Sequence, residues 1–126
     1  AGWRLFQEKG CVSCHSGVNL GGMSFEKIGL KSDYFDYRFE KHQIPETFAD
    51  AGRFNVTKVP SDRGKFKVPS LRNVALTAPY FHDGSVKDLD EAVNVMSEYQ
   101  LGEKLSDKET EELVEFLKSL SGNYRR

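Results

Sequence analysis

The residues best suited to chemistry in this chain are its two cysteines and the histidine that follows them. Cys11 and Cys14 are three positions apart, and His15 comes directly after the second cysteine. On one helical turn, side chains at this spacing lie on the same face. Two thiols placed in this way can each form a thioether with one of the two vinyl groups along a porphyrin edge, and the adjacent imidazole can bind the iron as proximal ligand. The C-x-x-C-H pattern therefore predicts covalent attachment of one c-type haem.

Three other interpretations of a C-x-x-C pair fit this sequence less well. A zinc site would need two more ligands, and the remaining histidines, His42 and His82, have no ligand-like spacing. A thioredoxin-like redox pair belongs beside a βαβ pattern, and no such alternation is visible. A structural disulfide is the third alternative. The coincidence of both cysteines and one of the three histidines in a five-residue stretch favours haem over all three.

A low-spin electron carrier needs a second axial ligand to the iron, and four residues could supply it: Met23, Met96, His42 and His82. Met23 follows His15 by only eight residues, so its side chain would have to pass round the ring edge to the opposite face. Met96 lies far along the chain on a predicted helix with an apolar side, where a thioether can be held rigidly. A methionine more often fills the core than binds a metal, but a low-spin haem needs a second axial ligand. We choose Met96.

The length and charge of the chain narrow the function further. Its 126 residues fit one domain, and 18 Lys and Arg nearly balance 19 Asp and Glu, which gives no indication of nucleic-acid binding. No apolar run approaches the length of a membrane span, and the N-terminal residues lack the apolar stretch of a signal peptide. Because bacteria attach haem c after export, we expect a periplasmic protein and a segment upstream of Ala1.

A helix is predicted at each end of the chain. Residues 1–14 carry small or apolar side chains at Gly2, Leu5 and Phe6, and Gly2 would let another helix approach closely. Near the other end, Ser106 to Glu109 form a capping box, an apolar stripe follows, and Gly122 stands where a C-cap glycine belongs. Two terminal helices that cross over the haem motif predict an all-α, class I cytochrome c-like domain.

The region between these helices is predicted to consist mainly of long loops around the haem. Residues 16–29 are rich in glycine, and residues 33–54 mix aromatic and charged side chains without a clear period, which we attribute to ordinary packing. A second capping box, Asp88 to Glu91, opens a predicted helix that carries Met96 and ends at Gly102.

Five segments have more specific sequences than the haem motif alone: GWRLF at 2–6, CHSGVNLGG at 14–22, FKVPSLRNV at 66–74, LTAPYFHDG at 76–84 and EAVNVM at 91–96. Together they resemble the C-terminal haem domain of the bacterial di-haem cytochrome c peroxidases, nearly from end to end. In that family this domain holds the high-potential, electron-accepting haem with histidine and methionine ligands, and Met96 matches the methionine. The related MauG proteins are similar in these segments but place a tyrosine where Met96 stands, which favours the peroxidase branch.

The resemblance also implies a calcium site between two haem domains, formed partly by backbone carbonyls in the Thr-x-Pro segment. The matching residues are Thr77 and Pro79. Oxygen donors suit calcium, and a turn fixed by proline can direct carbonyls outward. A simple turn is the alternative. His82 in the same segment is either functional or a histidine hydrogen-bonded within its loop.

The family's enzymes reduce peroxide at a preceding haem domain, which residues 1–126 do not contain because they have a single C-x-x-C-H motif. We therefore predict one-electron transfer through a haem c held by Cys11, Cys14, His15 and Met96, as the electron-accepting domain of a di-haem peroxidase. The expected partners are that second haem domain and a small donor, a cytochrome c or a cupredoxin. The alternatives are a free-standing monohaem carrier and a haem peroxidase active on its own.

Overall fold

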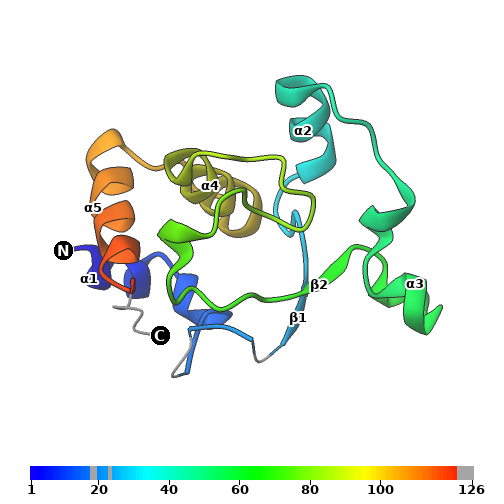
Figure 1. Cartoon of the computed structure of the whole chain (residues 1–126), viewed down its shortest axis with the longest axis horizontal. Helices are drawn as coiled ribbons and strands as arrows, with labels where there is room; N and C mark the ends of the chain where they lie inside the picture. Colours follow the sequence, from blue (N-terminus) through cyan, green and yellow to red (C-terminus); the bar gives the residue numbers. More distant parts are fainter. Residues whose placement is uncertain (18–19, 23, 122–126) are drawn as a thin grey trace.

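The computed structural model describes residues 1–17, 20–22 and 24–121. Helices dominate the described chain, and irregular segments connect them (Figure 1). The helices are α1 (Gly2–Glu8), α2 (Tyr34–His42), α3 (Phe54–Thr57), α4 (Leu89–Val95) and α5 (Asp107–Lys118), and the strands are β1 (Phe25–Lys27) and β2 (Lys65–Lys67). The two strands form an antiparallel ribbon in which Phe25 lies opposite Lys67 and Lys27 opposite Lys65. The expectation of an all-α domain is therefore correct for most of the chain and wrong for this ribbon.

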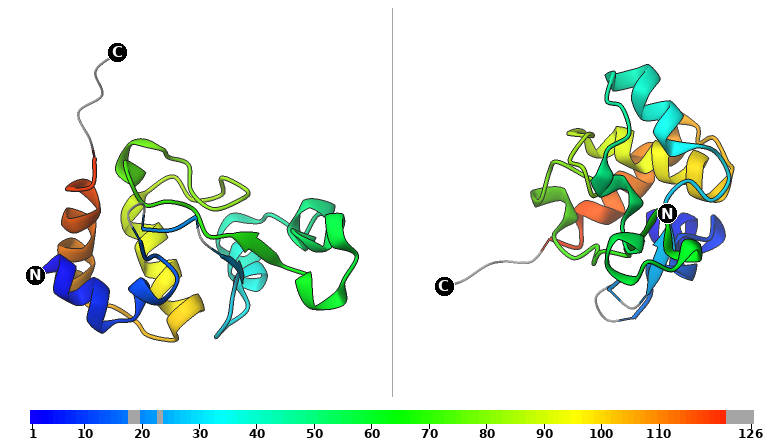
Figure 2. Two further views of the ribbon diagram at one scale, coloured as in Figure 1. Left: turned by 90° about the horizontal axis from the view of Figure 1, so that it is seen from below. Right: turned by 90° about the vertical axis from the view of Figure 1, so that its right-hand side faces the viewer.

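The terminal helices α1 and α5 pack against each other, as predicted (Figure 2). A Cβ atom at Gly2 would lie 2.5 Å from the Cβ of Phe116 and closer still to the carbonyl oxygen of Glu112, so only glycine permits this approach. Phe6 is buried at the crossing, with its ring 5.2 Å from that of Phe116, and Trp3 stacks on Phe6 from the outside. Aromatic packing over a glycine contact thus holds the two ends of the chain together.

Helix α1 is shorter than predicted, because residues 1–14 do not form one helix. It ends at Glu8, and Gly10 then adopts a left-handed conformation with φ +95°. Glycine enters this region without steric cost, so the chain can turn away from the helix axis here. A separate 3₁₀ turn, Cys11–Ser13, begins directly after it. The cysteines therefore lie on their own turn rather than on the end of α1.

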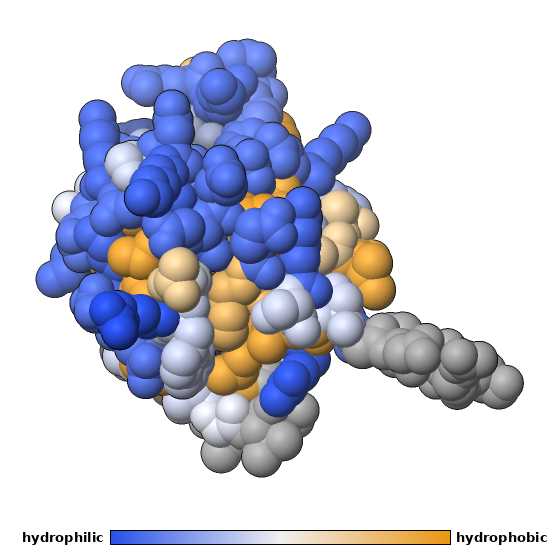
Figure 3. Space-filling view, turned by 90° about the vertical axis from the view of Figure 1, so that its left-hand side faces the viewer, coloured by the Kyte–Doolittle hydropathy of each residue, from blue (hydrophilic) through white to orange (hydrophobic). Residues whose placement is uncertain are grey.

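Helix α5 follows its predicted pattern closely. Ser106 and Glu109 form the reciprocal capping box, and the apolar stripe buries Leu113, Val114 and Leu117. The predicted C-cap, Gly122, lies outside the described residues. The opposite side of the helix is charged and exposed, and the face of the molecule formed by the terminal helices is largely hydrophilic with apolar patches between (Figure 3). Helix α5 is thus amphipathic, and its apolar side supports both α1 and α4.

Helix α4 begins after Asp88, and the helical segment stops at Gly102, both as predicted, but its cap and its last turn differ from the prediction. The side chain of Asp88 accepts a hydrogen bond from the backbone of Asp90, and no reciprocal capping box forms. After Val95 the helix widens into a π-helical turn, Met96–Leu101, which stops at Gly102 with φ +77°. The methionine proposed as iron ligand is the first residue of this wider turn.

The segment predicted as irregular, residues 33–54, contains helix α2. The side chain of Asp33 caps its first turn by accepting hydrogen bonds from the backbone of Phe35 and Asp36. The helix has no apolar stripe, because one of its two buried side chains is the charged Arg38 and the other is Tyr34. The prediction of packed aromatic residues is correct for Tyr34 and wrong for Phe48, which is 77% exposed. Within the described residues, no helix is long and apolar enough to cross a membrane.

Candidate haem attachment site

The two cysteines lie on the turn after α1 with their thiols unbonded to each other and partly buried. The turn is closed by a hydrogen bond from the Ser13 hydroxyl to the carbonyl oxygen of Gly10 (2.7 Å) and by one from the His15 amide to the carbonyl oxygen of Cys11 (3.0 Å). Burial raises the pKa of both thiols. A redox-active C-x-x-C pair instead has a lowered thiol pKa. The unbonded thiols and their raised pKa values therefore do not fit a low-pKa redox pair.

His15 lies beside two backbone carbonyl groups, those of Leu20 and Pro69. Its Nδ1 lies 3.1 Å from the carbonyl oxygen of Leu20, and because a carbonyl oxygen only accepts, Nδ1 carries the hydrogen. Burial lowers the pKa of the imidazole, so the ring is neutral near pH 7 and its Nε2 keeps a lone pair for a metal. A hydrogen bond of this kind orients a ligating histidine and fixes its tautomer.

The glycine-rich loop that supplies the Leu20 carbonyl is itself held against the segment after β2. The amide of Gly22 donates to the carbonyl oxygen of Val68 (2.6 Å), and a Cβ atom at Gly21 would overlap the carbonyl of Pro69. Only a residue without a side chain allows two backbones to approach so closely. The predicted loop around the haem is therefore a rigid support for His15, in the part of it that the structure describes.

The turn that begins at Met96 contacts the haem motif at its far end. A Cβ atom at Gly10, the residue before Cys11, would lie 3.7 Å from the side chain of Leu101. Next to this contact, Lys9 forms an ion pair with Glu103 at 3.3 Å. Met96 itself is partly buried. The structure thus brings the turn of the chosen methionine to the cysteine segment, whereas the rival, Met23, lies outside the described residues.

The two remaining histidines are engaged with carboxylates. Nε2 of His42 lies 2.8 Å from Oε2 of Glu91, and Nε2 of His82 lies 2.7 Å from Oδ1 of Asp50. Since a carboxylate oxygen accepts, each Nε2 donates a hydrogen and offers no lone pair to iron. The alternative of a hydrogen-bonded histidine is therefore correct for His82, although its partner comes from the turn at 48–51 rather than from its own loop.

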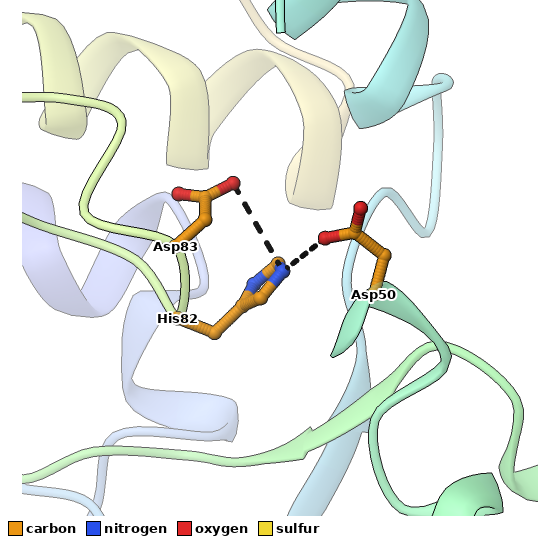
Figure 4. A group of neighbouring side chains, drawn as sticks. All are labelled: Asp50, His82 and Asp83. Carbon is orange, nitrogen blue, oxygen red and sulfur yellow. Dashed lines mark hydrogen bonds and ion pairs between the residues drawn. The ribbon is translucent and has the colours of Figure 1, made fainter. Parts of the chain in front are cut away.

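His82 belongs to a polar network around the buried Asp50 that the sequence did not predict (Figure 4). Ligand-type atoms of Asp50, His82 and Asp83 lie within 4.8 Å of one another, a spacing that could suit a metal ion. Arg38, however, donates to both oxygens of Asp50 (2.9 and 2.7 Å) and to Asp83 (2.6 Å). Its guanidinium supplies the positive charge for the cluster, and the His82 ring is stacked on Phe66. We interpret this network as a structural one.

The pKa shifts of this network follow from its ion pairs. Burial alone would raise the pKa of Asp50, but hydrogen bonds from Arg38, His82 and the Thr47 amide hold it well below its usual range. The pKa of Asp83 is also lowered, because hydrogen bonds from Arg38 and the Ser85 amide outweigh its burial. Both carboxylates are thus charged throughout the physiological pH range.

The two residues matched to a calcium site lie in an exposed turn. Thr77 ends a 3₁₀ turn, Val74–Leu76, and donates its hydroxyl hydrogen to the carbonyl oxygen of Val74 (3.1 Å). The peptide bond between Ala78 and Pro79 is cis. Calcium binding by the Thr77 and Pro79 carbonyls remains a prediction.

A groove of about 810 Å³ lies between residues 27–35 and residues 46–64. Phe35, Phe48 and Phe54 contribute to its walls, and none of the haem-site residues does. The groove is therefore separate from the residues that carry the haem chemistry.

The residues of the candidate site satisfy the requirements of covalent haem attachment. Two free thiols lie three positions apart, and a neutral imidazole whose Nδ1 hydrogen is bound by the Leu20 carbonyl follows them directly. The Cytochrome c family model matches residues 1–121. The chain belongs to the cytochrome c family, whose members carry haem c through this motif.

Individual relatives place the chain more closely within this family. It is 50% identical over 123 residues to the cytochrome c peroxidase Ccp of Escherichia coli K12, covering 98% of this chain and 25% of that protein. It is 44% identical over 125 residues to the cytochrome c551 peroxidase of Pseudomonas aeruginosa, covering 99% of this chain and 34% of the relative. The chain is thus a cytochrome c domain similar to bacterial cytochrome c peroxidases, and it spans between a quarter and about a third of the length of these relatives.

A solved structure gives the same assignment. The crystal structure of a MauG-like protein associated with microbial copper homeostasis matches with a TM-score of 0.74 at 29% identity, covering 95% of this chain and 42% of that one. The resemblance to the peroxidase and MauG family inferred from the sequence is confirmed.

Proposed function

We propose that this domain transfers single electrons through one covalent haem c with His15 and Met96 as axial ligands. The observation that supports it best is the state of His15, which follows two free thiols in the sequence: the Leu20 carbonyl accepts its Nδ1 hydrogen, so in the neutral ring the lone pair is on Nε2. Haem c, when bound, supplies an iron that gains and loses one electron.

Each of these residues has a separate task in this proposal. Cys11 and Cys14 hold the porphyrin edge, and the Leu20 carbonyl keeps the imidazole of His15 in one orientation. A thioether ligand from Met96 favours ferrous over ferric iron and raises the potential.

We further propose that the domain works as the electron-accepting part of a di-haem cytochrome c peroxidase-like protein in the periplasm. The similarity to two bacterial peroxidases supports this role, as does the small share of their length that the chain spans. The partners would be a second haem domain, where peroxide is reduced, and a small cytochrome c or cupredoxin as donor. Calcium held by the carbonyls of Thr77 and Pro79 would join the two haem domains. Tyrosine stands at the Met96 position in the MauG proteins, so methionine supports the peroxidase branch.

The decisive test has two parts and uses the chain matured with haem c. Acid–acetone extraction should leave the haem on the protein, with the pyridine haemochrome spectrum of two thioethers. The ferric protein should show the weak sulfur-to-iron absorption band at the red edge of the spectrum. Met96→Ala should abolish this band and lower the potential, and the matched variant Met23→Ala should change neither. Extractable haem would refute the attachment, and loss of the band in Met23→Ala alone would refute the choice of Met96.

A further inference from the structure

The turn that begins at Met96 is of a rare kind. It is a π-helical turn, Met96–Leu101, that continues α4 beyond Val95. Turns of this type occur mostly as single turns inside or at the end of α-helices, frequently at functional sites. Because the turn departs from the regular helix that precedes it, its position depends on contacts with the rest of the molecule. Those contacts decide where the Met96 side chain lies.

The side chain of Gln100 supplies the most specific of these contacts. Its carboxamide oxygen accepts hydrogen bonds from the backbone amides of Gly29 and Leu30, the second at 3.3 Å. Its nitrogen donates to the carbonyl oxygen of Lys27 at 3.0 Å. With two amide donors on one side and a carbonyl acceptor on the other, the carboxamide can have only this orientation.

The neighbouring residue strengthens the same attachment through its backbone. The carbonyl oxygen of Tyr99 accepts from the amides of Lys31 (2.8 Å) and Ser32 (3.4 Å), and the Tyr99 ring lies 5.1 Å from that of Tyr37 on α2. Residues 99 and 100 together therefore bind the backbone of residues 27–32 at five points.

The segment to which Gln100 binds is fixed rather than loose. It continues directly from β1, which pairs with β2, and the amide of Ile28 extends that pairing to the carbonyl of Gly64 (3.0 Å). Gly29 has φ +78°, and a Cβ atom there would lie 2.7 Å from the carbonyl oxygen of Ser32. A side chain at position 29 would therefore be strained and crowded, and the glycine exposes the amide that Gln100 binds.

The π-helical turn is also connected to the segment that precedes the haem motif. The hydroxyl of Ser97 donates to the carbonyl of Glu103 (2.7 Å), and the amide of Glu103 donates back to the Ser97 carbonyl (3.1 Å). Glu103 also pairs with Lys9, two residues before Cys11. The position of the turn thus depends on two contacts: one with the segment before the cysteines, through Glu103 and Lys9, and one with the β ribbon, through Gln100.

We propose that Gln100 is a positioning residue for the Met96 ligand: its carboxamide fixes the π-helical turn against residues 27–30 and so holds the thioether at a constant place. This inference rests on the proposed ligation by Met96. Without the three hydrogen bonds of the side chain, the turn moves more freely, and the sulfur–iron bond breaks before the rest of the domain unfolds.

The test compares Gln100→Leu, which keeps the volume and removes the hydrogen bonds, with Gln100→Glu, which keeps an acceptor for the two amides. Glu98→Gln, on the same turn, is the matched control. Urea titrations would follow the red-edge sulfur–iron band and the far-ultraviolet circular dichroism of the same haem-loaded samples. Hydrogen exchange would follow the amides of Gly29 and Leu30.

In Gln100→Leu the band should disappear at lower urea than the dichroism, whereas the two midpoints coincide in the wild type and in Glu98→Gln. Exchange at Gly29 and Leu30 should become roughly tenfold faster. Gln100→Glu should lie between, and it keeps the test valid if Gln100→Leu does not fold. Coincident midpoints in both Gln100 variants would overturn the positioning role. A wild-type band that survives in Met96→Ala would instead overturn the ligation itself, and this inference with it.

Discussion

Arg38 is the residue on which the packing of the middle of the chain depends. Its side chain is 1% exposed, and its guanidinium donates to Asp50, to Asp83 and to the carbonyls of Ile44 and Pro45. These partners come from three separate stretches between α2 and α4, so one side chain joins segments that are far apart in the sequence. A buried charge is tolerated here because every donor has an acceptor.

Arg38→Met should lower the free energy of unfolding by about 3–5 kcal/mol at pH 7, because it leaves the buried carboxylate of Asp50 and the partly exposed carboxylate of Asp83 without their cation. Lys41→Met, at an exposed position of the same helix, should change it by less than about 0.5 kcal/mol. Urea unfolding of the haem-loaded proteins measures both values. A loss of similar size in the two variants would show that the network contributes nothing specific.

The same network sets a pH dependence whose sign can be stated. The pKa values of Asp50 and Asp83 are lower in the folded protein than their ordinary value near 4, so this stabilisation is complete above about pH 4 and is lost as the pH falls further. In Arg38→Met, protonation removes the uncompensated charge of the two carboxylates and so stabilises the folded protein. The difference in stability between wild type and variant should therefore narrow from pH 7 toward pH 3, and a constant difference would contradict the ion pairing.

At the scale of elements, the frame of the site is the crossing of α1 and α5 and the contact of α5 with α4. The Thr110 hydroxyl donates to the Asn94 side chain at 3.0 Å, which fixes α5 beside the helix that leads to Met96. The segment with Cys11, Cys14 and His15 leaves directly from α1. A change in how α1 meets α5 is therefore transmitted to both sides of the haem site.

Gly2→Ala should destabilise the domain by about 1–3 kcal/mol, because the added methyl group would meet the Phe116 Cβ at 2.5 Å and the α5 backbone. Alanine is a better helix former than glycine by up to about 1 kcal/mol. Any net loss of stability in Gly2→Ala therefore comes from the helices being pushed apart. Gln7→Ala, exposed on the same helix, is the control. Thermal unfolding measures the effect, and equal stability of the two variants would mean that the crossing relaxes without cost.

The sequence predicted those elements whose signals are local. The Ser106 capping box, the apolar stripe of α5 and the small residue at Gly2 each act within one or two turns, and all three are correct. Helix α2 was missed because its buried side is polar and shows no apolar period. The cap at Asp33, with Lys41 and His42 in the last turn, was the signal that could have revealed it.

Features that depend on distant partners could not be predicted in this way. Strands β1 and β2 have three residues each and pair across about forty positions, which is too short a pattern to recognise. The Arg38 network and the Gln100 contact likewise join residues far apart in sequence. For the candidate site, the thiols and His15 followed from the motif alone. The Leu20 carbonyl that orients the imidazole became visible only in the fold.

At the scale of the whole molecule, the helical frame and the α2, α3 and β-ribbon part lie side by side (Figure 1). Two of the sets of hydrogen bonds that join them are those of Gln100 with residues 27–30 and those of Glu91 of α4 with Tyr37 and His42 of α2. Both reach the frame on α4 and its π-helical turn. The turn that begins at Met96 is therefore one place where the two parts of the domain can influence each other. If Met96 binds the iron as proposed, loss of either contact should weaken that bond.

The isolated domain should not reduce hydrogen peroxide. Peroxide reduction at haem needs a coordination position open to the oxidant and usually a nearby acid–base group. With His15 and Met96 bound to iron the first requirement fails, and the Nε2 atoms of His42 and His82 already donate to Glu91 and Asp50. The haem-loaded chain should therefore exchange electrons quickly with small carriers but show negligible steady-state peroxide turnover and no cyanide or carbon monoxide complex. Met96→Ala should bind carbon monoxide and cyanide at the opened iron. It should still be a poor peroxidase, because both candidate acid–base histidines are already engaged with carboxylates. Robust turnover by the unmodified chain would refute the electron-transfer assignment and establish a haem enzyme active on its own.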